Sequence, residues 1–462
     1  MLGLSEQVDK WISEVTVAPP NAEGILTRVV GLTLEASGIS APIGSRCDIE
    51  SKDGKVIRAE VVGFSEDKLL LMPFEKPRGA APGQRVVVKA NGANYGFSED
   101  MLGRVIDGLG SPLDDLGPIN PTEYRSLSAE PINPLSRRAI TEPLDVGVRA
   151  INALLTVGRG QRLGLMAGSG VGKSVLLGMM TRYTKADVIV IGLIGERGRE
   201  VQEFVKDTLG PDGMRRAVVI AAPSDTSPVA RIHGANLATA VAEFFRDKGK
   251  QVLLLVDSLT RVAHAQREVG LAVGEPPATK GYPPSVFTLL PSLIERAGNA
   301  HHSTGSITAF YTVLAEGDDQ QDPIIDSSRA ILDGHLVLTR ELAAQGHFPA
   351  IDILQSVSRL MPQLVSKGHY EAAIDLRRTY SAYEQNKDLI SVGAYQRGTD
   401  SDVDQALRQL PFIKDFLRQD MRSSVDIAES IRQLQSLPEE FDDLPSKSFP
   451  LDRSRDEEVL DG

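Results

Sequence analysis

Three hydrophobic patterns follow one another along this chain of 462 residues. In residues 24–97 apolar and polar positions alternate, which is typical of strands with one buried face. In residues 146–361 short apolar runs alternate with stretches of helical spacing, and in residues 362–436 only helical spacing remains. The order of these patterns predicts a small β-barrel, then an α/β domain, then a helical C-terminal domain.

The alternation in the first region is clearest near its start. Val30, Leu32 and Leu34 occupy every second position, with smaller or more polar residues between them. Asp53-Gly54 is a dipeptide typical of the tight turn in a β-hairpin. Together these features indicate antiparallel strands joined by short turns, as in a barrel.

The second region has the pattern of a mostly parallel sheet. Continuous apolar runs indicate strands that are buried on both faces, because helices cover such a sheet on each side. Residues 98–145, with several Gly- and Pro-containing turns, are predicted to connect the barrel to this domain. The expected strands are 188–194, 217–222, 252–256, 307–313 and 332–338.

Both ends of the chain differ from the regions between them. An apolar stripe predicts an amphipathic helix within residues 1–20, which either packs on its own domain or binds a partner. Residues 437–462 are rich in Pro, Ser, Asp and Glu, and we expect them to be disordered. The stripe consists of Leu4, Val8, Trp11, Ile12 and Val15.

Composition narrows the classes of function. The formal net charge of −12 argues against a general nucleic-acid binder, because such binding depends on phosphate neutralisation by Lys and Arg. A single cysteine, Cys47, excludes an internal disulfide and is typical of the reducing cytosol. The sequence has no apolar run of membrane-spanning length and no signal-peptide pattern. We therefore expect a cytoplasmic protein that reaches a membrane only through a partner.

A glycine-rich stretch, Ala-Gly-Ser-Gly-Val-Gly-Lys-Ser at 167–174, lies between an apolar run and a helical pattern. It predicts a phosphate-binding loop, in which successive backbone N–H groups and the positive end of a helix dipole bind one anion. Lys173 can reach the β- and γ-phosphates of a nucleotide, and the Ser174 hydroxyl can ligate Mg²⁺. Ala167 stands where the first glycine is usual. The residues expected to bind nucleotide are Gly168, Ser169, Gly170, Val171, Gly172, Lys173, Ser174 and Val175.

Two carboxylates are expected near this loop. Asp257 ends the apolar run 252–256, where it can complete a magnesium shell, although a strand also often ends in Asp because that residue caps helices. Glu196 follows the run 188–194 and so lies at the same carboxyl edge of the sheet. Glu196 is a candidate to orient and activate the attacking water. The alternative is a surface ion pair within the Arg- and Glu-rich stretch 195–200.

Several longer motifs resemble the catalytic subunits of type III export ATPases, relatives of the rotary ATP synthase α/β family. The resemblance covers about residues 24–437, in motif order as well as in content. The stretches 30–35 and 167–175 are more similar to the flagellar export ATPase than to its virulence-injectisome relatives. The other motifs are 133–177 with Pro143 to Ala150, Gly195 to Val201, Asp257 to Arg261, Gly281 to Ser285, and the signature at Pro349 to Asp352 and Ser356 to Arg359.

The resemblance implies both a fold and a set of site residues. The implied fold is an N-terminal β-barrel, a RecA-like nucleotide-binding domain with a mostly parallel sheet, and a helical C-terminal domain. The positions that match are Lys173 for the phosphates, Ser174 and Asp257 for magnesium, Glu196 as the catalytic glutamate, Arg197 and Arg261 for the γ-phosphate, Phe348 for the adenine ring, and Arg359 as the arginine finger.

The resemblance also implies an activity and partners. The activity is hydrolysis of ATP, with Mg²⁺, by a homo-hexameric ring that binds ATP at its subunit interfaces. The implied partners are a stator-like regulator on the N-terminal helix, a central stalk protein, export chaperones with flagellar export substrates, and the membrane export gate. A cytoplasmic enzyme with these partners is recruited peripherally to the inner membrane.

Three alternatives stand beside the flagellar export ATPase. The first is the ATPase of a virulence (injectisome) type III secretion system. The second is a regulatory subunit that binds nucleotide without hydrolysis, which is disfavoured because non-catalytic members of the family replace the glutamate present here as Glu196. The third is a ring-shaped RNA translocase. The acidic balance and the lack of basic-aromatic interleaving in residues 24–97 count against it.

Overall fold

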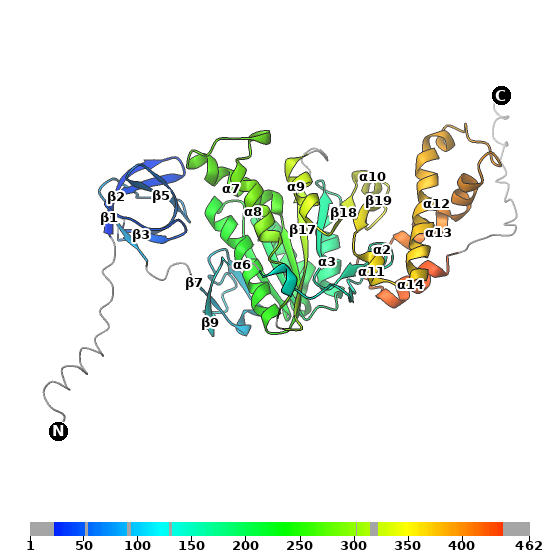
Figure 1. Cartoon of the computed structure of the whole chain (residues 1–462), viewed down its shortest axis with the longest axis horizontal. Coiled ribbons are helices and arrows are strands. Elements are labelled where there is room, and N and C mark those ends of the chain that lie inside the picture. The colour runs from blue at the N-terminus through cyan, green and yellow to red at the C-terminus, as the bar shows by residue number, and fades with distance from the viewer. Residues whose placement is uncertain are drawn as a thin grey trace, which may run out of the picture.

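Three bodies follow one another along the long axis of the molecule (Figure 1). In this computed structural model a barrel (blue) lies at one end, a sheet with its helices (cyan to yellow) in the middle, and a helical domain (orange to red) at the other end. The helix predicted in 1–20, the Asp53 of the predicted turn and the tail after Leu437 lie outside the described residues. The structure describes residues 23–50, 54–89, 94–128, 132–301, 303–314 and 322–437.

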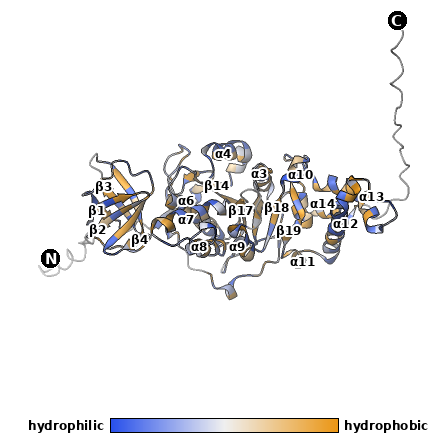
Figure 2. Cartoon of the chain, turned by 90° about the horizontal axis from the view of Figure 1, so that it is seen from above, coloured by the Kyte–Doolittle hydropathy of each residue, from blue (hydrophilic) through white to orange (hydrophobic). Residues whose placement is uncertain are grey.

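The barrel consists of the described strands β1 (Glu23–Val30), β2 (Thr33–Ser37), β3 (Arg46–Glu50), β4 (Val56–Ser65), β5 (Lys68–Pro73) and β6 (Arg85–Val88). They close in the order β1-β2-β5-β4-β3-β6. Alternate side chains fill the interior, where Leu26, Cys47, Ile49 and Leu71 are completely buried. Figure 2 shows the resulting mixture of apolar (orange) and hydrophilic (blue) residues along these strands.

The prediction that the alternation across Val30, Leu32 and Leu34 forms one strand is wrong. β1 ends at Val30, which pairs with Thr33 of β2, so Gly31 and Leu32 form the turn of a hairpin. Gly31 has a φ of 56°, a conformation that glycine adopts without steric cost. Of the three apolar residues only Leu34 enters the core, because the turn leaves Leu32 47% exposed.

The segment between the barrel and the α/β domain contributes to both the sheet and its surroundings. Its elements are β7 (Asn94–Phe97), η1 (Glu99–Met101), β8 (Val105–Asp107), β9 (Glu123–Ser126), η2 (Pro134–Ser136) and β10 (Pro143–Leu144). β7 pairs with β9 rather than with a barrel strand, although the barrel pattern was expected to continue to residue 97. β8 pairs in parallel with a strand of the central sheet, so the region expected as a linker supplies one edge of that sheet.

The central sheet contains the described strands β8, β12 (Arg162–Ala167), β13 (Val188–Ile194), β14 (Ala217–Ala222), β15 (Gln251–Asp257), β16 (Gly298–Asn299), β17 (Ser306–Leu314), β18 (Gly334–Leu338) and β19 (Ile351–Ser358). Their order is β19-β18-β12-β17-β15-β13-β14-β8, with β16 beside β17. All pairs are parallel except β18-β19 and β16-β17. The predicted fold class is therefore confirmed, and β19 is an additional antiparallel strand that the sequence pattern did not indicate.

Helices cover both faces of the central sheet, which explains its continuous apolar runs. Successive residues of β15 enter different cores: Leu254 packs with the first group of helices and Leu255 with the second. The first group is α6 (Pro228–Asp247), α7 (Leu259–Ala272), α8 (Pro284–Ile294) and α9 (Pro323–Ile331). The second is α2 (Arg149–Leu154), α3 (Lys173–Tyr183) and the π-helical turn η3 (Phe204–Leu209).

The remaining described helices complete the domain and form the C-terminal body. They are α4 (Gly198–Glu203), α5 (Gly210–Met214), η4 (Thr279–Gly281), α10 (Arg340–Ala344), α11 (Met361–Leu364), α12 (Lys367–Ser391), α13 (Ser401–Leu417) and α14 (Ile427–Gln435). Arg149 joins the two bodies, because its guanidinium donates to the carbonyls of Phe416 at 2.6 Å and Asp415 at 2.9 Å. Within the described part of the chain, every helix is too short or too polar to cross a bilayer.

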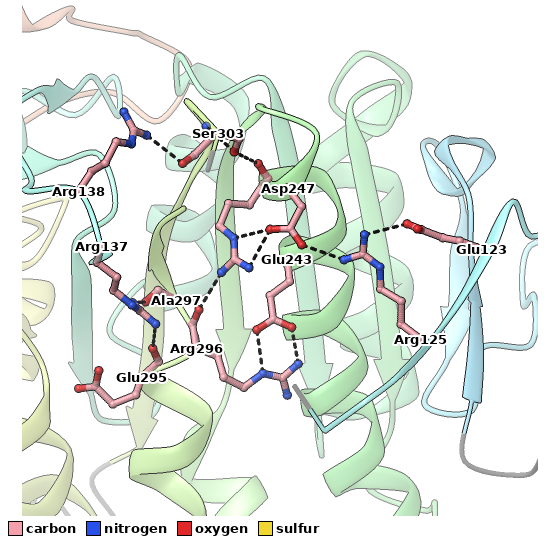
Figure 3. Close-up of polar contacts among 12 residues, drawn as sticks. Glu123, Arg125, Arg137, Arg138, Glu243, Asp247, Glu295, Arg296, Ala297 and Ser303 are labelled. Atoms are coloured by element: carbon pink, nitrogen blue, oxygen red, sulfur yellow. Dashed lines mark hydrogen bonds and ion pairs between the residues drawn. The ribbon is translucent and has the colours of Figure 1, made fainter. Parts of the chain in front are cut away.

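A network of charged residues lies where the strands of the central sheet begin (Figure 3). Glu243 of α6 accepts two hydrogen bonds from Arg296, with distances of 3.0 and 2.6 Å. Asp247, at the end of α6, pairs at 2.9 Å with Arg125 of β9. The pair with Arg125 fastens the segment before the nucleotide-binding domain to the amino edge of its sheet, and the pair with Arg296 ties α6 to the residues after α8.

Candidate active site

The glycine-rich loop lies at the carboxyl edge of the central sheet, opposite the network of Figure 3. β12 ends at Ala167, and α3 begins at Lys173. Gly170 and Gly172 have φ values of 79° and 87°, so side chains would strain the loop at both positions. Because the loop leads directly into a helix N-terminus, its backbone N–H groups and the helix dipole can act on the same anion.

Lys173 brings two carboxylates together. Its Nζ lies 2.5 and 2.7 Å from the two carboxylate oxygens of Asp257, and 3.5 Å from Oε1 of Glu196. The three residues come from α3, from the end of β15 and from the turn after β13, which meet because parallel strands end at one edge. Burial alone would lower the pKa of Lys173, but the Asp257 and Glu196 carboxylates outweigh it and raise this pKa.

Glu196 titrates in an unusual range for a carboxyl group. Burial raises its pKa to about 7, the Asp257 carboxylate acts in the same direction, and Lys173 opposes both. Its side chain is only 16% exposed, which is less than a surface ion pair would leave. A hydrogen bond with Glu196 lowers the pKa of Glu200. A carboxyl group with a pKa near neutrality can accept or donate a proton under physiological conditions.

Asp257 is almost completely buried, with 4% of its surface exposed. The alternative role of a helix cap belongs to its neighbour, because Ser258 caps α7 and accepts from the Arg261 N–H at 3.3 Å. Thr312 of β17 donates to Asp257 Oδ1 at 2.6 Å. The Asp257 carboxylate is therefore not used for capping and lies between Lys173 and Thr312.

The two arginines assigned to the γ-phosphate occupy different environments. Arg261, in the first turn of α7, packs against Gly195, where an added Cβ would lie 2.7 Å from the Arg261 Cβ. Its Nε is buried and has no hydrogen-bond partner among the described residues, so one donor is unused. Arg197 is exposed, and its backbone N–H points to Glu200 Oε2 at 3.4 Å.

Phe348 lies beside the loop in a position open to a ligand. A Cβ added to Gly172 would lie 3.5 Å from the Phe348 ring, and Phe348 remains 46% exposed. Its carbonyl accepts from the Gln419 N–H at 3.0 Å, which ties this segment to the C-terminal body. An exposed aromatic ring next to a phosphate-binding loop is a suitable surface for a nucleobase.

Arg359 is the one candidate that the structure does not bring to this site. It follows β19, and β19 runs antiparallel to β18, with Ser358 opposite Gly334. Arg359 therefore lies at the amino edge of the sheet. The length of β19, roughly 25 Å, separates it from the edge where the loop lies. Its exposed side chain donates to the carbonyl of Arg329 at 3.2 Å.

Two residues near the site were not assigned any role from the sequence. Thr312 lies in the apolar run 307–313, and a hydroxyl inside a buried run was the available signal. Glu200 belongs to the Arg- and Glu-rich stretch 195–200, and such clusters are usually solvated.

The oxygen donors present fit a magnesium ion that is bound together with a nucleotide. In the part of the chain that the structure describes, no group of three or more His, Cys, Asp or Glu residues could hold a metal. Asp257 and Ser174 supply one carboxylate and one hydroxyl. This small donor set suits Mg²⁺, which keeps several waters and takes its other ligands from phosphates.

A separate cavity of about 1250 Å³ lies between the barrel and the central domain, lined by residues that include Arg46, Glu60, His233 and Arg296. None of the glycine-rich loop residues lines it. The concentration of loop, lysine and carboxylates therefore marks the carboxyl edge of the sheet, rather than this cavity, as the candidate active site.

A glycine-rich loop between a parallel strand and a helix, with an aspartate at the end of a neighbouring strand, defines a P-loop nucleotide hydrolase. Family comparisons refine this class. The model for the nucleotide-binding domain of the ATP synthase alpha/beta family matches residues 147–358, and that for its beta-barrel domain matches 26–88. The model for the T3SS EscN ATPase C-terminal domain matches residues 365–436. The chain belongs to the ATP synthase alpha/beta family.

Individual relatives give the same result. A protein from Pseudomonas aeruginosa named flagellum-specific ATP synthase is 57% identical over 91% of this chain and 94% of its own. The assembled ATPase EscN of the enteropathogenic E. coli type III secretion system is 44% identical, with a TM-score of 0.84 over 89% of this chain and 98% of EscN. EscN in complex with its central stalk EscO is 43% identical, with a TM-score of 0.82 and the same coverage. The chain is an ATP hydrolase of the type III export class.

Proposed function

We propose that this chain is the ATPase of a flagellar type III export apparatus, which hydrolyses ATP to unload chaperones and deliver flagellar proteins to the export gate. The observation that supports the flagellar branch is the higher identity to the flagellum-specific relative, 57%, than to the type 3 secretion system ATPase of Xanthomonas euvesicatoria, 48%. The observation that supports catalysis is the contact of Lys173 with both Asp257 and Glu196.

In the proposed reaction, the loop N–H groups and Lys173 bind the β- and γ-phosphates of ATP. The phosphates compete with Asp257 for the Lys173 ammonium. Glu196, in its deprotonated form, accepts a hydrogen bond from the attacking water and orients it towards the γ-phosphorus. The unused Arg261 donor and the exposed Arg197 are available to the γ-phosphate oxygens, and the Phe348 ring packs on the adenine.

Mg²⁺ is part of the proposed site. Ser174 and Asp257 would hold it with the nucleotide, directly or through water. The bound ion would neutralise charge on the phosphate oxygens as the β–γ bond breaks. This chain contributes the two oxygen donors and the lysine that balances them.

We further propose a homo-hexameric ring, in which Arg359 acts on ATP bound by a neighbouring subunit. Arg359 cannot reach the loop of its own chain, because β19 separates the two. The solved complex of EscN with its central stalk EscO supports a stalk partner for this chain too. A stator-like regulator on residues 1–20, chaperones, export substrates and recruitment to the inner membrane complete the proposal.

Lys173→Ala tests the catalytic part. The Lys173 ammonium contacts carboxylates of the site rather than the apolar core, so we expect loss of ATP hydrolysis in a chain that still folds. The matched control is Lys185→Ala, which removes an exposed lysine beyond the end of α3. Phosphate release at normal rates from the Lys173 variant, or its unfolding, would contradict the assignment.

A pull-down from cells with the intact chain tests the branch. Capture of rod, hook or filament proteins with their chaperones would support flagellar export. Capture of injected effectors would instead assign the chain to a virulence secretion system.

A further inference from the structure

Thr312 places a hydroxyl on a face of the sheet that is otherwise apolar next to the site. On this face β12 contributes Leu165, which lies opposite Thr312 in the strand register, and β15 contributes Leu255 and then Asp257. Thr312 is completely buried. A buried hydroxyl costs free energy unless it makes a hydrogen bond, so its partner is informative.

The Thr312 hydroxyl donates its hydrogen bond to the Asp257 carboxylate. The distance from Oγ1 to Asp257 Oδ1 is 2.6 Å, whereas the distance to the Val256 carbonyl is 3.4 Å. A hydroxyl has one proton to donate, and the shorter contact to an ionised acceptor is the stronger one.

We propose that Thr312 is a positioning residue for the nucleotide-bound metal, which it serves by fixing the orientation of the Asp257 carboxylate. This inference rests on the proposed function, since it concerns the same magnesium site. Thr312 is β-branched and sits in the middle of the sheet, so its own side chain is stiff. The hydrogen bond from Thr312 to Oδ1 restricts rotation of the carboxylate, so both of its oxygens stay in contact with the Lys173 ammonium, Oδ1 at 2.5 Å and Oδ2 at 2.7 Å from Nζ.

Two observations distinguish this role from that of a buried threonine whose hydroxyl only needs a hydrogen-bond partner. First, the shorter hydrogen bond of Thr312 goes to a group of the site, and the backbone carbonyl of Val256 is the more distant acceptor. Second, Thr308 offers an internal comparison: it lies on the same face of β17, is 1% exposed, and its Oγ1 accepts from the Gly160 N–H at 2.9 Å. Loss of either hydroxyl should affect packing similarly, but only loss of the first should affect the metal.

The test compares Thr312→Val, which keeps the shape and removes the hydroxyl, with Thr312→Ser and with the control Thr308→Val. The affinity of each variant for a fluorescent ATP analogue is measured in EDTA and across a range of Mg²⁺ concentrations, together with its melting temperature. Residues that orient metal ligands typically affect metal affinity by about 10- to 100-fold. We therefore expect Thr312→Val to need about tenfold more Mg²⁺ for half-maximal tightening of binding, with unchanged affinity in EDTA.

Thr312→Ser should restore the magnesium response, and Thr308→Val should keep it. A normal magnesium response in Thr312→Val, or the same loss in Thr308→Val, would overturn the role of Thr312 and leave the proposed ATPase intact. A wild-type chain whose nucleotide affinity does not depend on Mg²⁺ would overturn both the magnesium site and this inference.

Discussion

Two clusters of buried charge lie at opposite edges of the same sheet and differ in how their charges are balanced. At the amino edge, Arg296 and Glu243 form a two-pronged pair, with side chains 11% and 9% exposed (Figure 3). At the carboxyl edge, Lys173 is shared by Asp257 and Glu196, with side chains of similar burial. The two clusters are similarly buried but differ in charge balance. We therefore assign the balanced pair at the amino edge to stability of the fold, and the unbalanced cluster at the carboxyl edge to ligand binding.

The unequal balance has a chemical consequence. One cation cannot neutralise two buried carboxylates, so the pKa of Glu196 rises to about 7 through burial and the Asp257 charge. In the proposed reaction, a nucleotide with Mg²⁺ would bring phosphate charge to Lys173 and positive charge to the carboxylates, and so would change the partners of all three side chains. The paired cluster at the amino edge has no such imbalance, and we assign it to stability.

Substitution of Arg359 should have the largest effect on turnover. It also tests whether the division of roles between the two edges holds. It lies at the amino edge, yet we assign it to the chemistry of a neighbouring subunit. By analogy with other arginine fingers, Arg359→Ala should lower turnover by about a thousandfold or more, with nearly unchanged nucleotide affinity. The measurements are steady-state phosphate release and nucleotide binding.

Mixing two inactive variants tests whether Arg359 acts between subunits. In mixed rings of Lys173→Ala and Arg359→Ala, some interfaces combine an intact loop with an intact arginine. Partial recovery of hydrolysis supports action in trans. No recovery in rings shown to be mixed contradicts it, unless the ring is shown separately to require all six sites at once.

Glu196→Gln is expected to have the next largest effect. The amide keeps the shape of the side chain but cannot accept a proton, so turnover should fall by about a hundredfold or more while ATP still binds. Single-turnover hydrolysis and ATP binding measure the two properties separately. Near-normal turnover would return Glu196 to the role of a structural ion pair.

Glu243→Gln should have the opposite profile. It leaves the buried Arg296 without its carboxylate, which should reduce the free energy of unfolding by about 3 kcal/mol. The turnover of the folded fraction should stay unchanged. Glu75→Gln is the matched control, because the pair of Glu75 with Arg58 is largely exposed and should contribute under about 1 kcal/mol. A loss of nucleotide affinity in Glu243→Gln would remove the distinction between the edges.

The smallest predicted effect is on stability as a function of pH. Because the folded chain raises the pKa of Glu196 from 4.5 to about 7, folding favours its protonated form, and this stabilisation is lost as the pH rises through about 7. Glu196→Gln mimics the protonated side chain. It should match the wild type near pH 4, below the ordinary pKa of 4.5, and exceed it near pH 8.5 by on the order of 1 kcal/mol, after allowance for partial exposure. Thermal unfolding at both pH values, without nucleotide, measures this difference.

The sequence alone was enough to predict those features of the site that follow from strand direction. The predicted apolar runs 188–194 and 252–256 are parallel strands, so the residues after them meet at one edge, as Glu196 and Asp257 do. Local pattern was insufficient where a partner strand decides the outcome. The turn at Gly31 interrupts an alternation that looks continuous. β19 forms the edge of the sheet and carries polar residues such as Gln355 at exposed positions, so it lacks a continuous apolar run.

The hydrogen bond between Thr312 and Asp257 shows the same limit within the site. The two residues are 55 positions apart, and only the register of β15 with β17 brings them together. The roles of the site residues remain predictions of chemistry, which the variants above address.

We expect crowding at the carboxyl edge to hold Glu196 near its point of half-protonation at neutral pH. Infrared difference spectra between the wild type and Glu196→Gln, recorded without nucleotide across a pH series, isolate the absorption of this one carboxyl group. We predict a protonated-carboxyl band in the wild type that disappears with a midpoint near pH 7. A midpoint near 4.5, the ordinary value, would contradict the claim.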